Sequence, residues 1–326
     1  MAGVQHSLKP GRKKGVREKR LTALSDAERD VKATGIRFLP ECSLGSGGLC
    51  EVVAARDILR HEYGDGTPRV AIKRLLPEYA RNPAARRLMA REFFIARNLS
   101  HPGIVRVFDL HEDHAGPFLS MELLAGKNLY IMQAEQPSGL GAAVIPLAYS
   151  LFETLSFLHA AGVAHGDIKP ANLIQESNNR LVLLDFNTAE IIPLPGCASS
   201  PLCQGLRSNL GQAACSILHA SPERLEGRAP SFADDIFAAC CTLYELAQGS
   251  HPFGRHTSRE AQSEGKKPAG MSWRKARKEK ILLQGLSYDP MKRPTAAELA
   301  EAFRPGKFEP WWLSWLQVGR NTIKEF

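Results

Sequence analysis

The 326-residue sequence contains no run of about eighteen or more apolar residues, the length at which a membrane-spanning helix is predicted. Its N-terminus also lacks the apolar stretch that follows the basic residues of a secretory signal. These absences argue against a membrane-spanning or secreted protein. We therefore expect a cytoplasmic protein with no transmembrane segment.

Cysteine is scarce and shows no metal-site pattern. None of the seven cysteines lies in the Cys-x-x-Cys spacing that is typical of zinc and redox sites. Cys240 and Cys241 are adjacent in an apolar helical run, where buried, reduced thiols are the expectation. The composition, with 44% hydrophobic and 23% charged residues, is ordinary for a globular chain that is long enough for two lobes.

Acidic residues are nearly absent from the N-terminal end. The first twenty residues hold seven lysines or arginines against one acid, Glu18, so they carry six of the eight net positive charges. Such a block usually forms a solvated, disordered tail, and contact with nucleic acid or an acidic membrane is the alternative. We expect residues 1–35 to form that tail, and nucleic acid is not expected as a partner. A second basic stretch, residues 274–280, either faces solvent or recruits an acidic protein substrate.

The most informative stretch is polar. Residues 165–172 read His-Gly-Asp-Ile-Lys-Pro-Ala-Asn, and an apolar run then ends in Asp-Phe-Asn at residues 185–187. Asp167 and Asn172 lie five positions apart, and Asp185 follows a short strand-like run. Phosphoryl transfer needs an acceptor hydroxyl in line with the γ-phosphate, and divalent cations that neutralise the transferring oxygens. This spacing predicts a phosphoryl-transfer enzyme.

The residue types suggest a role for each group. Mg²⁺ prefers oxygen ligands, so Asp185 would bind the ion that bridges the phosphates and Asn172 would bind a second ion. Asp167 would accept the proton of the attacking hydroxyl, and Lys169 can reach the γ-phosphate and the acceptor oxygen. Each residue alone would more often be an ordinary polar group of a loop. Their joint spacing favours catalysis.

A phosphate-binding region should precede this loop, and the sequence offers one. Residues 44–52 read Leu-Gly-Ser-Gly-Gly-Leu-Cys-Glu-Val, which predicts a hairpin whose glycines let the backbone approach phosphates. Lys73 ends a short strand-like run, and Glu92 follows nineteen residues later in a helical pattern from about residue 83 to 99. A Lys73–Glu92 ion pair would aim the ammonium at the α- and β-phosphates.

In this order the motifs resemble those of the eukaryotic-type (Hanks-type) serine/threonine protein kinases. The resemblance extends over about residues 36–304. Residues 221–223, Ser-Pro-Glu, stand where the family has Ala-Pro-Glu, and Arg293 matches the late arginine that pairs with this glutamate. Residues 118–123 look like the strand that enters the interlobe hinge, with Met121 as gatekeeper. A single compact catalytic domain suggests a bacterial member.

The resemblance implies an α+β, two-lobed protein-kinase-like fold. A small, mainly antiparallel β N-lobe with one helix would occupy about residues 36–122, and a larger, mainly helical C-lobe about residues 123–304. ATP would bind in the interlobe cleft with Mg²⁺ or Mn²⁺, and Leu184 would line its adenine end. The expected ATP-binding residues are Leu44, Gly45, Ser46, Gly47, Gly48, Leu49, Cys50, Glu51, Val52, Ala71, Lys73, Glu92, Met121, Glu122 and Ile174.

Several departures from the family pattern modify these expectations. Gly166 replaces the arginine of His-Arg-Asp, which ordinarily pairs with a phosphorylated activation-loop residue, so we expect activity without that phosphorylation. Asn187 replaces the glycine of Asp-Phe-Gly, and because asparagine tolerates the left-handed region, we expect restricted flipping with metal binding by Asp185 retained. Cys50 occupies the third glycine position of the loop and Leu49 its aromatic tip. No charged catalytic group is lost.

Two residues indicate the substrate class. Lys169 matches the serine/threonine-directed subgroup, and Ser216 stands where that subgroup has a threonine that bridges the catalytic aspartate and lysine. The alternative for Ser216 is an ordinary loop serine. The expected reaction transfers the γ-phosphate of ATP to serine or threonine hydroxyls of protein substrates, including the chain itself. The candidate autophosphorylation sites are Ser199, Ser200 and Ser208, although serines in such a loop are more often unmodified.

Two other functions stay open. His-Gly-Asp with a later asparagine also resembles the aminoglycoside and choline phosphotransferases, which phosphorylate small molecules. Those enzymes usually lack the Lys169-Pro170 pair and the Glu223–Arg293 pairing that this sequence keeps. A nucleotide-binding pseudokinase scaffold is the non-enzymatic alternative.

The C-terminal residues 305–326 are rich in tryptophan. Trp311, Trp312 and Trp315 cluster there with two leucines, and exposing so many large apolar side chains is costly. We expect this segment to fold onto the C-lobe as a short helix, with docking of a partner or a membrane edge as the alternative.

Overall fold

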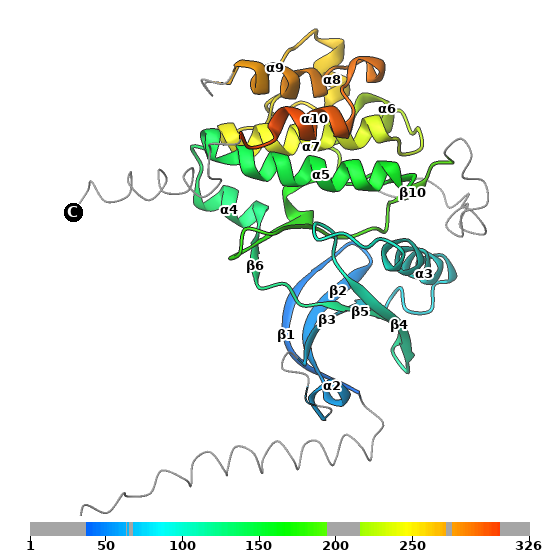
Figure 1. Cartoon of the computed structure of the whole chain (residues 1–326). Helices are drawn as coiled ribbons and strands as arrows, with labels where there is room; N and C mark the ends of the chain where they lie inside the picture. Colours follow the sequence, from blue (N-terminus) through cyan, green and yellow to red (C-terminus); the bar gives the residue numbers. More distant parts are fainter. Residues whose placement is uncertain (1–36, 63, 65–67, 194–215, 272–275, 307–326) are drawn as a thin grey trace, which may run out of the picture.

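The chain folds into a β-rich lobe joined to a helical lobe (Figure 1). The structure is a computed structural model that describes residues 37–62, 64, 68–193, 216–271 and 276–306. This arrangement confirms the predicted α+β, two-lobed fold. The basic N-terminal tail, the three candidate serines and the tryptophan-rich segment lie outside the described residues.

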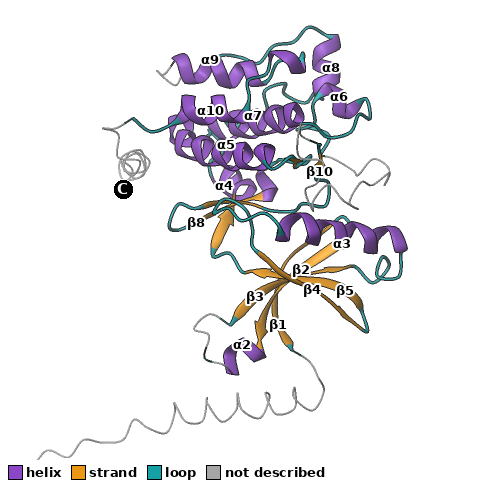
Figure 2. Ribbon diagram, turned by 45° about the vertical axis from the view of Figure 1, so that its right-hand side comes forward, coloured by secondary structure: helices purple, strands orange, loops and turns teal. Residues whose placement is uncertain are grey.

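The smaller lobe is built on a five-stranded antiparallel sheet with the strand order β1-β2-β3-β5-β4. Its apolar side chains meet α3, which lies along the side of the sheet that faces the helical lobe (Figure 2). The sheet and its helices comprise β1 Phe38–Gly47, β2 Cys50–Asp57, α2 Ile58–Glu62, β3 Arg69–Leu75, α3 Pro83–Arg97, β4 Val107–Asp113 and β5 Gly116–Glu122.

Two local features of this lobe differ from the sequence-based interpretation. Most of the glycine-rich segment is strand, because Gly45 and Gly47 belong to β1 and only Gly48 and Leu49 form the turn to β2. The lobe was expected to contain one helix, but a second, short helix, α2, directly follows β2. Polar residues with a single buried isoleucine gave no clear helical period over so few positions.

The helix α3 carries Glu92 toward β3. Asn82 starts it by accepting hydrogen bonds from the N–H groups of Ala84 and Ala85, and Pro83 occupies the first helical position, where its missing N–H costs nothing. The apolar residues Met89, Phe93 and Ile95 are buried and attach the helix to the core. The helix ends at Arg97, two residues earlier than the sequence suggested.

The larger lobe surrounds α5, which buries four leucines at helical spacing, Leu147, Leu151, Leu155 and Leu158. One stretch of the described chain, Gly141–Ala160, is long and apolar enough to cross a membrane by length and composition alone. Half of that stretch is buried inside the protein, and it contains α5, so we assign it to the core of this lobe.

Short strands and helices complete the larger lobe and position the polar loop of residues 165–172. That loop runs between β7 and β8, and β10 pairs with β7 on its other side. The elements are β6 Gly126–Asn128, α4 Leu129–Glu135, η1 Gly141–Val144, α5 Ile145–Ala160, β7 Val163–Ala164, η2 Pro170–Asn172, β8 Leu173–Glu176, β9 Leu181–Leu183, β10 Glu190–Ile191, α6 Pro222–Leu225, α7 Phe232–Gln248, α8 Ser258–Ser263, α9 Ala276–Gly285, η3 Pro290–Lys292 and α10 Ala296–Phe303.

Candidate active site

Lys73 joins the two lobes through carboxylates. It lies on β3, the middle strand of the sheet, and its side chain is only 9% exposed. Its Nζ lies 2.7 Å from each carboxylate oxygen of Glu92 and 2.7 Å from Oδ1 of Asp185. Burial alone would lower the pKa of Lys73, but Asp185 and Glu92 outweigh burial and raise the pKa. The predicted Lys73–Glu92 ion pair is therefore present, with the ammonium charged at neutral pH.

The helix α7 anchors the loop that carries Asp167. Asp235, in the first turn of that helix, accepts hydrogen bonds of 2.8 Å from the N–H groups of both His165 and Gly166, and its carboxylate also lies 3.0 Å from His159. The His165 ring donates to the carbonyl of Leu184 at 2.9 Å, which links the loop to the residue before Asp185. The sequence analysis did not predict this anchor. The sequence feature that could have indicated it is Asp235 itself, which directly follows the capping residue Asp234 at the start of an apolar helix.

Asp167 lies at the centre of a hydrogen-bonded group. Lys169 Nζ lies 2.6 Å from its Oδ2, and the N–H of Ser216 donates to its Oδ1 at 2.9 Å. Lys169 also donates to the Ser216 hydroxyl at 2.8 Å, while Asn172 donates to the backbone carbonyl of Asp167 at 2.8 Å. Ser216 thus bridges the aspartate and the lysine, as predicted. These contacts fix the carboxylate in one orientation.

Replacing Ser216 with alanine is expected to lower kcat about tenfold, because Lys169 would lose one fixed partner worth roughly 1–2 kcal/mol at this partly exposed position. The backbone contact to Asp167 should survive the change. Ser216→Thr, which keeps the hydroxyl, is the matched control and should retain most activity. Steady-state phosphorylation rates for the two variants would check this, and equal losses in both would contradict the bridging role.

Asp185 and Asn172 offer oxygen ligands to a divalent cation. Asp185 adopts the left-handed backbone conformation (φ 64°), and burial alone would raise its pKa, but Lys73 outweighs burial and lowers the pKa, so the carboxylate is ionised. The amide nitrogen of Asn172 donates hydrogen bonds to the backbone carbonyl and the carboxylate of Asp167. These bonds fix the orientation of the Asn172 amide oxygen. Within the described residues, no group of three or more acidic, His or Cys side chains could hold a metal unaided. This suits Mg²⁺, which usually binds one or two protein ligands together with substrate phosphates.

The glycine-rich hairpin leaves its backbone accessible. A Cβ added at Gly45, Gly47 or Gly48 would meet no atom within 4 Å, so a phosphate chain could approach the backbone there. Val52 pairs with Lys73 across β2 and β3, and the turn of the hairpin lies further along the same strands, where Leu49 accepts a hydrogen bond from the N–H of Leu76 at 2.8 Å. Burial raises the pKa of the neighbouring Cys50 to about 11, so its thiol stays neutral.

The other predicted ATP-site residues fall into two groups. Ala71 and Met121 are buried and directly opposite each other in the β3–β5 pairing, while Val52, Ile174 and Leu184 are half-buried. Around the phosphate end, the β1–β2 hairpin carries Leu44, Ser46, Leu49 and Glu51.

The side chain of Glu122 has hydrogen-bond partners within the protein. Its carboxylate accepts hydrogen bonds from Arg180 at 2.8 and 3.0 Å and from the N–H of Arg106 at 2.7 Å. The side chain therefore joins β5 to the turn between β8 and β9, and the contact of residue 122 with the nucleotide stays a prediction. Sequence reasoning placed Glu122 by its position after Met121, and nothing local revealed Arg180, which lies 58 residues away.

Known proteins match this chain over most of its length. The family model described as a protein kinase domain matches residues 39–303. The chain belongs to the protein kinase domain family. A probable serine/threonine-protein kinase of Corynebacterium efficiens is 33% identical over 225 residues, covering 67% of this chain and 31% of the relative. The serine/threonine-protein kinase PknB of Mycobacterium tuberculosis is 30% identical over 286 residues, covering 82% of this chain and 42% of the relative.

The chain therefore spans 31% of the length of the first of these curated relatives and 42% of the second. A probable serine/threonine-protein kinase of Streptomyces coelicolor is similar as well, at 29% identity over 64% of this chain and 30% of the relative. The three relatives are bacterial proteins, which agrees with the bacterial, Hanks-type resemblance inferred from the motifs.

The backbone at residue 166 requires a glycine. It has φ +82°, and an added Cβ would lie 2.9 Å from the carbonyl oxygen of Thr188 and 3.1 Å from Pro230. Residue 166 thus has neither the backbone conformation nor the space for an ordinary side chain. In the Asp-Phe-Asn motif the left-handed residue is Asp185, and Asn187 does not adopt positive φ, so the expected restriction of flipping stays a prediction.

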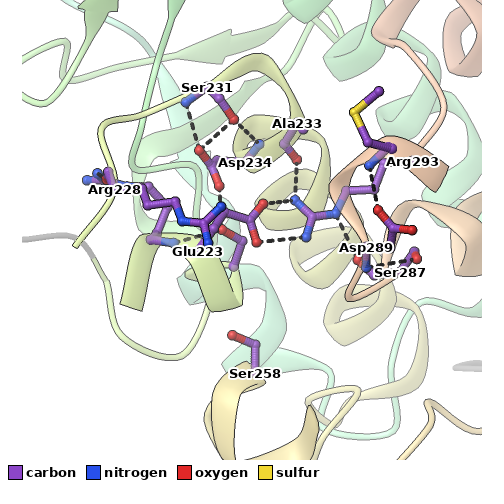
Figure 3. Close-up of polar contacts among 12 residues, drawn as sticks. Glu223, Arg228, Ser231, Ala233, Asp234, Ser258, Ser287, Asp289 and Arg293 are labelled. Atoms are coloured by element: carbon purple, nitrogen blue, oxygen red, sulfur yellow. Dashed lines mark hydrogen bonds and ion pairs between the residues drawn. The ribbon is translucent and has the colours of Figure 1, made fainter. Parts of the chain in front are cut away.

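The Glu223–Arg293 pair of the family pattern is present and buried (Figure 3). Arg293, whose side chain is fully buried, binds both carboxylate oxygens of Glu223 and donates to the carbonyls of Ser287 and Ala233. Burial alone would raise the pKa of Glu223, but the hydrogen bonds and charge of Arg293 outweigh burial and lower the pKa. The pair ties α6, which follows the activation segment, to the C-terminal helices.

Replacing Arg293 with methionine should lower the free energy of unfolding by about 3 kcal/mol, because Glu223 would keep a buried charge without a partner. Urea unfolding at pH 7 would measure this. The contribution of a carboxylate with a lowered pKa is present above its usual pKa of 4.5 and is lost as the pH falls through the lower folded-state pKa. The difference between wild type and variant should therefore shrink below about pH 4.5.

The exposed pair Arg304–Glu301, at 2.9 Å, supplies the control for this experiment. Arg304→Met should change the stability by less than about 0.5 kcal/mol, since exposed ion pairs contribute little. A similar loss in both variants would contradict the role given to burial.

Proposed function

We propose that this chain is an ATP-dependent serine/threonine protein kinase. The observation that carries the proposal is the contact of Lys73 with Glu92 and Asp185 in a chain that also holds Asp167 in a fixed hydrogen-bonded group. These are the charged groups that phosphoryl transfer from a nucleotide requires, and they lie in two lobes that come together at this point. The kinases named among its relatives support the serine/threonine class.

In this proposal residues of the chain bind ATP, orient its phosphates and accept a proton from the substrate hydroxyl. The backbone of the β1–β2 hairpin from Gly45 to Gly48 covers the phosphates of ATP, and Lys73 contacts the α- and β-phosphates while Glu92 holds the ammonium in place. Asp185 and Asn172 would hold Mg²⁺, which would supply positive charge to neutralise the phosphate oxygens. Asp167 accepts the proton of the attacking hydroxyl, and Lys169 stabilises the transferring group.

Two features favour a protein acceptor over a small alcohol. Lys169 and Ser216 are joined at 2.8 Å beside Asp167, in the arrangement expected for the serine/threonine-directed subgroup. The buried Glu223–Arg293 pair fixes the region after the activation segment, where a protein substrate would lie. The pseudokinase alternative is disfavoured because no charged group of the site is replaced. Autophosphorylation and a cytoplasmic location belong to the proposal as well.

The proposal is tested by offering different acceptors. Purified full chain, labelled ATP and Mg²⁺ would be incubated with casein, with kanamycin and with choline, and phosphoamino acids would be identified after hydrolysis of the protein. We expect label on serine and threonine of casein and none on the small molecules. Preferential labelling of kanamycin or choline would favour a small-molecule phosphotransferase, and absence of any transfer would favour a scaffold.

A further inference from the structure

Arg91, the residue before Glu92 on α3, reaches into the segment that follows Asp185. It is 7% exposed, and its guanidinium donates to the carbonyl of Ala189 and forms an ion pair of 2.9 Å with Glu190. Glu92 on the same helix contacts the backbone of Phe186, besides Lys73. Two successive residues of α3 thus hold both ends of a five-residue stretch, 186–190.

The far end of this stretch is itself fixed to the catalytic loop. Glu190 lies on β10 and pairs with Ala164 of β7, the residue before His165. The Thr188 hydroxyl donates to the carbonyl of His165 at 2.9 Å. A displacement of Glu190 away from Arg91 would therefore require the strand pairing beside the catalytic loop to move, or α3 to swing away with Glu92.

The charge on Arg91 needs a permanent partner. Its side chain is nearly buried, whereas that of Glu190 is 28% exposed, so the carboxylate keeps some contact with water while it compensates the guanidinium. Gly166 has no side chain and, at φ +82°, no room for one, so residue 166 of the catalytic loop supplies no cation to this segment. Arg91 of α3 supplies a cation to residues 186–190, and it pairs there with the carboxylate of Glu190, which needs no phosphorylation.

We propose that Arg91 and Glu190 form a positioning pair that sets α3, and through Glu92 also Lys73, for ATP binding without a phosphorylated residue. This inference rests on the proposed kinase function for its effect on turnover. Neither residue touches the reacting atoms. With the pair broken, α3 spends more time turned away from β3, and only the fraction of molecules with the Lys73–Glu92 contact binds ATP productively.

The test compares Glu190→Gln with a control variant that breaks another ion pair made by α3. Arg86 and Glu112 form an ion pair of 2.7 Å that also joins α3 to the sheet, but their side chains are 36% and 62% exposed and lie away from Lys73. Glu112→Gln is therefore the control. Binding of a fluorescent ATP analogue, hydrogen exchange of the α3 amides and phosphorylation kinetics would be measured on phosphatase-treated protein of each kind.

For Glu190→Gln we expect KM for ATP and Kd for the analogue to rise about tenfold, with kcat at saturating ATP reduced much less, because the competent fraction falls but bound ATP restores it. The α3 amides should exchange faster, and Glu112→Gln should match the wild type in all three measurements. Arg91→Lys, which keeps the charge but loses the forked contact to Ala189 and Glu190, should show an intermediate effect.

Unchanged analogue binding and unchanged α3 exchange in Glu190→Gln would overturn the positioning role, as would equal effects in Glu112→Gln. Should Glu190→Gln be too unstable to purify, Arg91→Lys decides the question by the same readouts. Analogue binding and exchange do not depend on phosphoryl transfer. A wild type that binds the analogue but transfers no phosphate would therefore overturn the proposed function and leave the pair to be judged by exchange.

Discussion

Replacing Asp167 with asparagine is expected to reduce kcat by about 10³-fold, because general-base catalysis by a positioned group contributes on the order of 10²–10⁴ in rate. The carboxylate is 8% exposed and held by Lys169, Asn172 and the N–H of Ser216. An amide keeps this shape but accepts no proton at neutral pH. Binding of ATP should change by less than about threefold, since Asp167 contacts the acceptor rather than the nucleotide. Single-turnover transfer and analogue binding measure the two quantities separately.

Asp109→Asn is the control for this variant. Asp109 is an exposed residue on β4 whose carboxylate accepts a hydrogen bond from the adjacent N–H of Leu110, so replacing the carboxylate should leave kcat unchanged. A loss of ATP affinity in Asp167→Asn as large as its loss of kcat would show that Asp167 binds the nucleotide, and would contradict the assigned role.

Replacing Lys73 with methionine is expected to lower kcat/KM for ATP by about 10³-fold, which is the effect of removing one preorganised charge from a transferring phosphate. The change also leaves Glu92 and Asp185 facing each other without their shared cation. Both KM and kcat should deteriorate, because the lysine orients the phosphates in the bound and the transition state alike. Kinetics at varied ATP, with thermal unfolding to verify that the variant is folded, would measure this.

Arg74→Met offers a control one residue along the same strand. Arg74 lies on the other face of β3, where it pairs with Asp113 at 3.0 Å and covers the ring of Phe118. Its loss should lower stability slightly and leave KM for ATP within about twofold of wild type. Undiminished kcat/KM in Lys73→Met would contradict the lobe geometry described above.

The catalytic constellation was predictable because local spacing encodes it. A loop that carries Asp167 and Asn172 five positions apart, followed by Asp185 after a short strand, leaves few arrangements that satisfy all three residue types. The pairing of Lys73 with Glu92 followed from a strand end and a helical face in the expected order. The helix α5 was predictable in the same way, since the helical period of its leucines alone predicts a buried helix.

The contacts that hold this constellation in place were not predictable from local sequence. Asp235 reaches the catalytic loop from a helix about seventy residues away, and Arg180 binds Glu122 across 58 residues. Only the folded chain reveals such partners. The left-handed backbone of Asp185, which contacts Lys73, is likewise a feature that no local pattern indicated.

We infer that the active site folds into its working arrangement without prior phosphorylation of the chain. The most direct measurement is rapid-quench transfer of labelled phosphate from Mg²⁺–ATP to casein by full chain that has been treated with phosphatase and shown by mass spectrometry to carry no phosphate. We predict transfer from the first turnover with no lag. Transfer that begins only after a lag, and that shortens when the chain is phosphorylated beforehand, would contradict the claim, as would no transfer at all.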